Sequence, residues 1–477
     1  MPNSPTTLTD ELGIALHNLA DAAAGTFTPT LRLGVTGLSR AGKTIFITAL
    51  VHDLLAGGTL PGFAPLSEGR LIGARLAESP DAAIPRFAYE EHLDALTGRA
   101  PHWPESTRRI SQLRLTLKYR SRRWWRSGPV SLNLDIVDYP GEWLLDLPLL
   151  SLSFAEWSIQ ALDRARRDGV PAEARAFLDA IAATDAGKPA TDPEAETLAR
   201  LFTAYLRASR ADEHALSALP PGRFLMPGDL EGSPALTFAP LPPSPSTPRS
   251  GSLYAMLERR YEAYKEIVVR PFFRDHFARL DRQIVLVDAL RALNAGPTAV
   301  ADLETALTDI LACFRQGESN PLQRLVARRI DRILFAATKA DHLHRTSHDR
   351  LEAILNRLVS RAARRARFAG AATSSIALAA VRATREGRSQ DLDVIIGTPE
   401  AGERFAGTVY DGKTEIALFP GELPPDPEAA LAGGGVDLNF LRFLPPARLE
   451  RNGDGMPILP HIRLDSALDF LLSDHLK

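Results

Sequence analysis

The sequence predicts an α/β protein of the P-loop NTPase class, with a G-domain-like sheet that is mostly parallel and contains one antiparallel hairpin. Three observations predict this fold class. A phosphate-loop sequence, residues 37–44, lies between an apolar strand and a helix. Short apolar strands at 283–288, 332–337 and 375–381 alternate with helices, as in doubly wound sheets. Two strands of alternating polarity, 110–119 and 130–137, are joined by a connection of hairpin length.

Composition places the chain among ordinary globular proteins and excludes several classes. It has 477 residues, of which 45% are hydrophobic and 24% charged, so two or three units are expected. The formal net charge of −2 does not favour a nucleic-acid-binding protein. A single cysteine, Cys313, excludes a disulfide framework and fits a reducing cytosol. Because no apolar run is long enough for a transmembrane helix and the N-terminus lacks a signal-peptide pattern, we expect a cytoplasmic protein whose membrane association is at most peripheral.

The phosphate loop has the sequence Gly-Leu-Ser-Arg-Ala-Gly-Lys-Thr and matches the pattern G-x-x-x-x-G-K-[ST]. Its glycines let successive amides converge on phosphate oxygens, and the following helix N-terminus favours an anion. Lys43 is expected to contact the β- and γ-phosphates and to act in catalysis, and the Thr44 hydroxyl to bind Mg²⁺. The alternatives are an accidental match and, for Arg40, an ordinary exposed arginine. The residues predicted to bind the nucleotide here are Gly37, Ser39, Arg40, Ala41, Gly42, Lys43, Thr44 and Ile45.

A second motif, D-x-x-G at residues 138–141, follows the second hairpin strand. A carboxylate at the end of such a strand can hold Mg²⁺, so Asp138 is the predicted metal-binding residue. Gly141, three residues later, can offer its amide to the γ-phosphate with no side chain in the way. Asp135 is the competing carboxylate, but its spacing to a glycine is wrong. A plain turn at the strand end is the alternative interpretation.

A third motif, Thr338-Lys339-Ala340-Asp341, directly follows the apolar strand over 332–337. It matches the pattern [NT]-K-x-D, which recognises guanine. The Asp341 carboxylate can accept hydrogen bonds from the ring N–H and the exocyclic amine of guanine, which adenine cannot supply. The aliphatic stem of Lys339 can cover the face of the base. The three motifs in this order predict GTP or GDP as the bound nucleotide.

In this order the motifs resemble those of the translation-factor class of GTPases, and nearly the whole chain resembles the YcjX-like family of bacterial P-loop proteins. The resemblance implies a GTPase that binds GTP or GDP with Mg²⁺, cytoplasmic residence, a stress-associated role and a membrane protein partner of the YcjF type. The segments that carry it are residues 37–44, 103–108, 138–143, 223–232, 338–341, 381–386 and 460–464.

The resemblance also assigns three further residues. Thr107, just before the first hairpin strand, matches the switch threonine that contacts Mg²⁺ and the γ-phosphate. The resemblance therefore places Thr107 among the catalytic residues. The alternatives are that Ser106 has this role, or that Thr107 is a plain residue at the start of the strand. Glu142 occupies the position where many GTPases place a glutamine that orients the attacking water. Its negative charge beside phosphate predicts slow hydrolysis, and a simple helix-starting acid is the alternative. Val381 lies where a base-contacting loop is expected, but the sequence there departs from the usual Ser-Ala.

The domain organisation follows from composition along the chain. Residues 1–149 and 281–387 are expected to form a discontinuous P-loop core, and 150–280 a helical insertion that contains a Pro/Ser-rich surface or mobile loop at 219–251. The part from 388 to 477 is expected to be β-rich and to end in a helix over 464–476, capped by Asp465 or Ser466. A further helix is expected over 8–24.

Two arginine-rich segments lie outside these motifs. The tip of the predicted hairpin carries Trp124 and Trp125 between arginines, which suits a membrane headgroup region, a protein partner or single-stranded nucleic acid, or a tip folded back on the protein. A helix is predicted over 347–368, and its arginines at 361–367 are interpreted as cations at a helix C-terminus and on a solvated face.

Three functional hypotheses remain open at this stage. The favoured one is a GTP-binding, slowly hydrolysing switch whose helical insertion and C-terminal part dock a partner. The second is a nucleotide-stabilised scaffold at the membrane with negligible catalysis. The third is an ATP-using P-loop enzyme.

Overall fold

The computed structural model describes residues 28–38, 40–79, 81–105, 107–122, 128–167, 169–211, 214–243, 249–312, 330–389, 391–433 and 437–477. The predicted helix at 8–24, Ser39, Ser106, Trp124, Trp125 and Cys313 lie outside the described residues. The chain divides into two compact units. The sheet unit comprises the described parts of Ala20–Tyr139, Leu280–Pro297 and Arg329–Lys477, and the helical unit those of Pro140–Arg279 and Thr298–Arg328.

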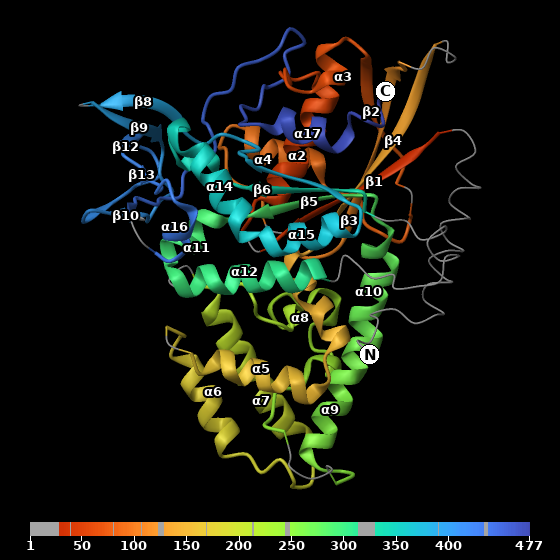
Figure 1. Cartoon of the computed structure of the whole chain (residues 1–477), viewed down its shortest axis with the longest axis vertical. Helices are drawn as coiled ribbons and strands as arrows, with labels where there is room; N and C mark the ends of the chain where they lie inside the picture. The colour runs from red at the N-terminus through yellow and green to blue at the C-terminus, as the bar shows by residue number, and fades with distance from the viewer. Residues whose placement is uncertain are drawn as a thin grey trace. The chain divides into compact units, whose positions relative to one another are not determined.

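The sheet unit contains a seven-stranded sheet in the order β2-β3-β4-β1-β5-β6-β7, drawn in Figure 1. Strands β4, β1, β5, β6 and β7 are parallel neighbours, whereas β2, β3 and β4 pair antiparallel. The mostly parallel sheet and its β3–β4 hairpin are therefore confirmed. The strands are β1 (Thr30–Gly37), β2 (Leu71–Ala77), β3 (Ser111–Arg120), β4 (Pro129–Asp138), β5 (Arg282–Val287), β6 (Arg332–Ala337) and β7 (Ala372–Ala377).

Two elements of this sheet differ from the sequence prediction. Strand β2 lies within 58–106, where the sequence predicts no strand, and it extends the sheet by pairing with β3. The strand predicted at 375–381 starts earlier, at Ala372, and ends at Ala377, which pairs with Ala337, the last residue of β6. Beyond that point the backbone of Ala379 pairs with Ile462 of the C-terminal segment. The edge of the sheet is thus completed by residues distant in sequence.

Helices surround the sheet within the same unit. The single helix predicted over 347–368 is divided at Val359 into α14, which contacts β6 and β7, and α15, which contacts β7. The helical segments are α2 (Lys43–Ala56), α3 (Ala64–Ser67), α4 (Tyr89–Thr97), α11 (Ala289–Ala295), η6 (Ala340–His342), η7 (Arg345–Ser347), α14 (His348–Leu358), α15 (Ser360–Phe368), α16 (Pro427–Leu431) and α17 (Leu464–Leu472).

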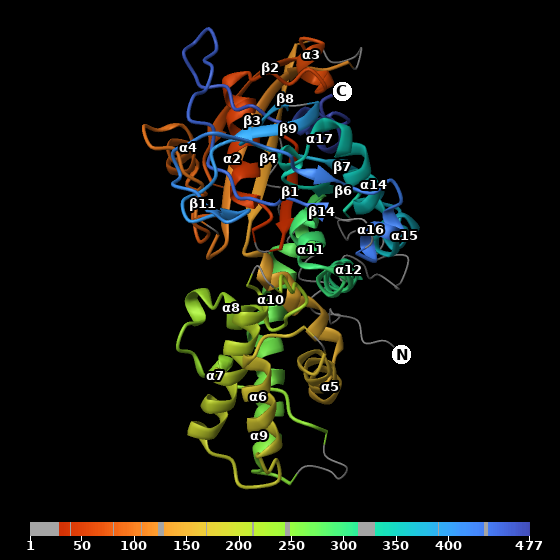
Figure 2. The same cartoon turned by 90° about the vertical axis from the view of Figure 1, so that its left-hand side faces the viewer.

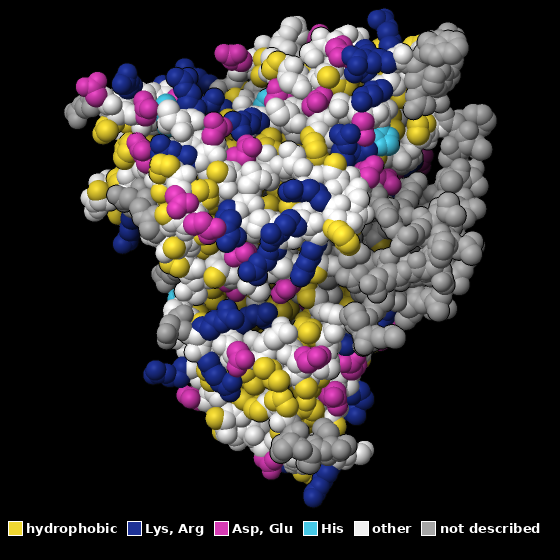
Figure 3. Space-filling view, in the orientation of Figure 1, with side chains coloured by type: hydrophobic (Ala, Val, Ile, Leu, Met, Phe, Trp, Pro, Cys, Tyr) yellow, Lys and Arg dark blue, Asp and Glu magenta, His cyan; other side chains and the backbone are white. Residues whose placement is uncertain are grey.

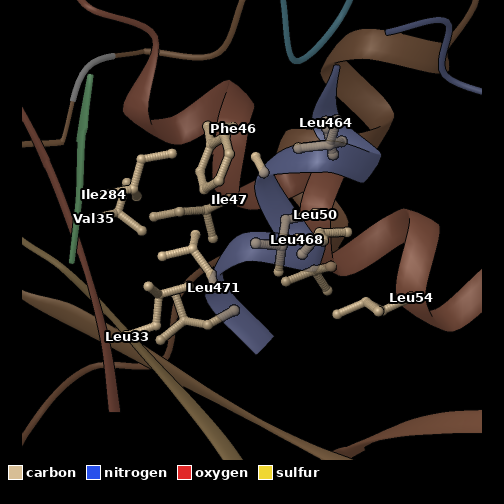
Figure 4. Packing of buried hydrophobic residues seen from close by; sticks show 14 of the residues in the cluster. Leu33, Val35, Phe46, Ile47, Leu50, Leu54, Ile284, Leu464, Leu468 and Leu471 are labelled. Atoms are coloured by element: carbon tan, nitrogen blue, oxygen red, sulfur yellow. The ribbon is translucent and has the colours of Figure 1, made fainter. Parts of the chain in front are cut away.

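The core of the sheet unit forms where α2 and α17 meet the central strands. Leu33 and Val35 alternate along β1 with residues of the opposite face, as expected for a strand of period two. Both are fully buried, as are Leu50 of α2 and Leu468 of α17. Figure 4 shows these side chains from β1, α2 and α17 pointing toward one another. The C-terminal helix is therefore part of the core beside the phosphate-loop helix.

The predicted cap of this closing helix is wrong. Arg463, in a left-handed conformation, precedes α17, and its side chain does not cap the helix. Asp465 lies inside the first turn and accepts a hydrogen bond from the Gly62 amide at 2.7 Å. This hydrogen bond links α17 to the segment that follows α2.

The C-terminal part is rich in short strands, as the sequence predicts, and the first of them, β8, begins before residue 388. They form a three-stranded sheet, β12-β9-β8, and two two-stranded sheets, β10-β11 and β13-β14. A small core of Ile395, Leu418, Leu441 and Phe443 holds them together. The strands are β8 (Arg385–Ser389), β9 (Leu392–Gly397), β10 (Arg404–Phe405), β11 (Thr408–Val409), β12 (Ile416–Leu418), β13 (Gly421–Glu422) and β14 (Asp437–Leu438).

The helical unit packs around buried aromatic side chains. Trp157 stacks on Tyr261 with ring centroids 5.0 Å apart, and Phe238 meets both rings edge-on. Helices α6 and α7 of this unit pack against each other, as drawn in Figure 2. The elements are η1 (Gly141–Ser151), α5 (Phe154–Ala165), α6 (Glu173–Ala182), α7 (Asp192–Ser209), α8 (Gly222–Leu225), η2 (Gly228–Leu230), η3 (Pro234–Leu236), α9 (Leu253–Tyr264), η4 (Lys265–Val269), α10 (Arg270–Asp275), η5 (Phe277–Arg279) and α12 (Pro297–Ala312).

The prediction of a surface or mobile loop over 219–251 is wrong for part of that segment. Phe238, Ala239 and Leu241 have no exposed surface, because the apolar residues between the prolines fill the aromatic core of the helical unit. Across the described ranges, no helix combines the length and the apolar character needed to cross a membrane.

Replacement of Leu468 by alanine tests the role of α17 in the core. Because Leu468 is fully buried, Leu468→Ala should lower the free energy of unfolding by about 2–5 kcal/mol. Leu392→Ala, at a leucine that is 49% exposed, is the matched control and should change it by less than about 1 kcal/mol. Chemical denaturation measures both, and equal effects would contradict the placement of α17.

Candidate nucleotide-binding site

The phosphate loop connects β1 to α2 through a turn that contains two residues in the left-handed conformation. Arg40 and Gly42 have positive φ values of 63° and 80°, and the Ala41 amide donates to the Leu38 carbonyl at 3.1 Å. Gly42 precedes α2 and offers no side chain that could cap that helix. The amides at the start of α2 are thus available to an anion.

Two hydroxyls and one carboxylate meet beside this loop. The Thr107 hydroxyl donates to Asp138 Oδ2 at 2.6 Å and lies 3.3 Å from the Thr44 hydroxyl. Lys43 Nζ is 4.0 Å from Asp138 Oδ1. Thr44 and Asp138 are buried. The structure therefore brings together the phosphate-loop threonine, the predicted switch threonine and the predicted metal-binding aspartate.

These oxygens fit a magnesium ion. Mg²⁺ prefers oxygen ligands and is held by few protein groups, and neighbouring ligands in its octahedron are about 3 Å apart. The spacings from Thr107 to Thr44 and from Thr107 to Asp138, 3.3 and 2.6 Å, are of this size. Asp138 Oδ1 is also buried without a hydrogen-bond partner, as expected for a ligand oxygen. Among the described residues no group of three or more His, Cys, Asp or Glu side chains could hold a metal ion, so a site built on such a cluster is not found there.

The electrostatic environment of Asp138 combines opposing effects. Burial has the largest effect and raises the pKa of its carboxyl group above the ordinary value, although the charge of Lys43, the Thr107 hydrogen bond and nearby His92 act to lower it. The following residue, Tyr139, is fully buried and its hydroxyl lies 2.7 Å from the Thr36 hydroxyl. This bond fixes the end of β4 next to the end of β1.

The competing carboxylate, Asp135, has a structural role. Arg114 donates two hydrogen bonds to it across the β3–β4 hairpin, at 2.6 and 2.7 Å. A bidentate arginine pair of this kind fixes the register of neighbouring strands. Asp135 therefore does not share the environment of Asp138.

The predicted base-recognition motif lies after β6. Asp341 is buried, and its Oδ2 accepts a hydrogen bond from the Ala383 amide at 2.7 Å. The Thr384 hydroxyl donates to the Asp341 carbonyl. The loop after β7 therefore meets the motif after β6 through Ala383 and Thr384. Val381 of the same loop is buried in the hydrophobic core, and its predicted contact with the base stays a prediction.

Lys339 is held by a residue that follows β5. Its backbone is left-handed, with φ 61°, and its Nζ lies 2.6 Å from Asp288 Oδ2. The ammonium group is therefore fixed while the aliphatic stem spans the distance from the end of β6 to the end of β5. Thr338, the first residue of the motif, is buried, and its amide donates to the Val287 carbonyl.

The candidate groups lie at one edge of the sheet. Strands β1, β4, β5, β6 and β7 are parallel, so their carboxyl ends meet at the same edge. The phosphate loop follows β1, Asp138 ends β4, Asp288 follows β5 and the base motif follows β6. Ligands bind at this edge in open α/β sheets.

Gly141 and Glu142 follow Pro140 at the start of the helical unit, where several contacts hold the segment. Glu142 forms an ion pair with Arg210 at 2.5 Å. Asp146 accepts hydrogen bonds from the Gly222 amide and the Tyr264 hydroxyl, each at 2.7 Å, and burial raises the pKa of its carboxyl group to about 6. The segment after D-x-x-G is thus fixed by residues distant in sequence.

Sequence reasoning does not identify Asp288, Arg210 or Ala383. Asp288 offers a signal, since a polar residue at the carboxyl end of a buried parallel strand is a candidate ligand contact. No feature of the sequence identifies Arg210 or Ala383, because each is one of many similar residues in its region.

A model of the YcjX-like family (DUF463) matches residues 31–476. The chain belongs to this family. A relative from Escherichia coli strain K12, named Ras-like GTPase YcjX, is 38% identical over 463 residues, which cover 94% of this chain and 96% of the relative. A protein of the same name from Shewanella oneidensis is 37% identical over 497 residues, covering 98% and 99%.

Replacement of Gly222 tests how tightly the segment after D-x-x-G is held. A Cβ at this position would lie 1.7 Å from the Glu142 carbonyl oxygen, so Gly222→Ala should destabilise the helical unit by about 3 kcal/mol. Gly187→Ala is the control, because its Cβ would meet only the Asp185 side chain, at 3.4 Å. Thermal unfolding measures both, and an unchanged Gly222→Ala protein would contradict the close contact.

Proposed function

We propose that this chain binds GTP and GDP with Mg²⁺ and hydrolyses GTP slowly. The observation that carries the proposal is the meeting of the loops after β6 and β7 at Asp341, on the sheet edge that also carries the phosphate loop. Membership of a family whose relatives are named Ras-like GTPases supports it.

In this proposal the phosphate loop binds the nucleotide through its backbone amides and Lys43. Thr44, Thr107 and Asp138 hold Mg²⁺, which when bound neutralises charge on the phosphates. Gly141, three residues beyond Asp138, offers its amide to the γ-phosphate. The other residues that shape the loop or begin its helix are Gly37, Ser39, Arg40, Ala41, Gly42 and Ile45.

Guanine is recognised by the Asp341 carboxylate. Because the Ala383 amide already occupies Oδ2, Oδ1 accepts hydrogen bonds from the N–H groups of the base. Lys339, held at its amine by Asp288, covers the base with its stem. Adenine lacks the matching donors and is excluded.

Slow hydrolysis follows from the identity of Glu142. A carboxylate adds negative charge where a glutamine would orient water, and the ion pair with Arg210 competes with any water that the carboxylate would hold. Lys43 then stabilises the charge that develops on the transferring phosphoryl group. We also propose a cytoplasmic, stress-associated role with a YcjF-type inner-membrane partner, on the strength of the family resemblance.

Nucleotide specificity is tested by Asp341→Asn. The variant should bind GTP about 10- to 150-fold more weakly, because a hydrogen bond to a charged group contributes about 1.5–3 kcal/mol, and it should gain affinity for xanthosine triphosphate. Equilibrium titration with labelled nucleotides measures this. Asp179→Asn, at an exposed helix position, is the control. Equal affinity of the wild-type chain for ATP and GTP would instead support an ATP-using enzyme.

Hydrolysis is tested in single-turnover experiments with excess protein. The wild-type chain should convert GTP to GDP and phosphate at least about 10-fold faster than Lys43→Ala, because Lys43 stabilises the transferring phosphoryl group. A wild-type rate equal to that of the variant would support the scaffold without catalysis.

A further inference from the structure

We propose that the exposed face of α15 is a docking surface for an anionic phospholipid bilayer. This surface, the α15 basic face, consists of Arg361, Arg364, Arg365 and Phe368, all of which are exposed. It is independent of the nucleotide chemistry proposed above.

The four residues form one continuous stripe. Their spacing, i, i+3, i+4 and i+7, places them on one side of a helix. The opposite side carries Ala362, Ala363 and Ala366, which are buried, and α15 contacts β7. The helix is therefore anchored by its alanines and presents its arginines and one phenyl ring outward.

Structural roles do not explain the charges of both Arg364 and Arg365 in this stripe. Cations in the last turn of a helix complement its dipole, which gives a reason for Arg365 but not for Arg364. Neither Arg364 nor Arg365 forms an ion pair with any other described residue. Arginines three and four positions apart also repel one another. The accumulation of positive charge is therefore better explained by an anionic partner.

The neighbouring helix provides a contrast. On α14, Arg350 lies 3.2 Å from Glu422, and Arg357 pairs with Glu428. Its arginines thus stabilise packing against the C-terminal part. Figure 3 shows Lys and Arg side chains gathered over the position that α15 has in Figure 1.

Phe368 identifies the bilayer as the partner. It is 89% exposed, more than any other large hydrophobic side chain among the described residues. The following residues, Ala369, Gly370 and Ala371, offer no polar side chain that could contact base edges. A row of arginines that ends in an exposed apolar tip suits the boundary between phosphate headgroups and acyl chains.

Vesicle sedimentation with the full chain tests the proposal. We expect binding to phosphatidylcholine vesicles that contain phosphatidylglycerol, no binding to pure phosphatidylcholine, and loss of binding at about 0.5 M NaCl because the charges are screened. Arg364→Ala with Arg365→Ala should lower the partition coefficient roughly 25-fold, since each arginine near an anionic surface contributes about fivefold. Phe368→Ser should lower it roughly 10-fold.

The control is Arg350→Ala with Arg357→Ala, which removes the same charge from α14. It should leave binding within about twofold of wild type, because each of these arginines is paired with a glutamate, and thermal unfolding checks that all variants are folded. Equal loss in both double variants, equal binding to the two vesicle types, or binding to a single-stranded or duplex oligonucleotide without binding to vesicles would overturn the proposal.

Discussion

The buried carboxylate of Asp138 is the group on which the candidate site depends. Taking a charged group out of water is costly unless partners compensate. Here Thr107 and Lys43 provide partial compensation, and one carboxylate oxygen has no hydrogen-bond partner. A cation at this place would complete the compensation. The need to stabilise this charge thus explains why polar groups from three separate segments of the chain converge there.

The strand end that carries Asp138 also begins the connection to the helical unit. Tyr139 is bonded within the sheet unit, whereas Glu142 and Asp146 are held within the helical unit. Only Pro140 and Gly141 separate these two sets of contacts along the chain. Pro140 and Gly141 therefore join two segments that are each fixed by contacts of their own.

Much of the fold, and the placing of the candidate motifs at the ends of strands, can be predicted from the sequence, because those features are local. The phosphate loop, D-x-x-G and the base motif are short patterns placed by the strands before them. The pairs Glu142–Arg210, Lys339–Asp288 and Asp341–Ala383 join residues 68, 51 and 42 positions apart. No periodic pattern in the sequence indicates that residues so far apart are in contact. The burial of Phe238 could not be predicted from the sequence, because the prolines around it suggest a surface loop.

A crystal structure of the chain with Mg²⁺ and a non-hydrolysable GTP analogue tests base recognition and metal binding together. We expect Asp341 Oδ1 to accept hydrogen bonds from the guanine N–H groups, and Thr44, Thr107 and Asp138 to surround the metal ion directly or through water. A base bound away from Asp341, or a metal ion away from Asp138, would contradict this expectation.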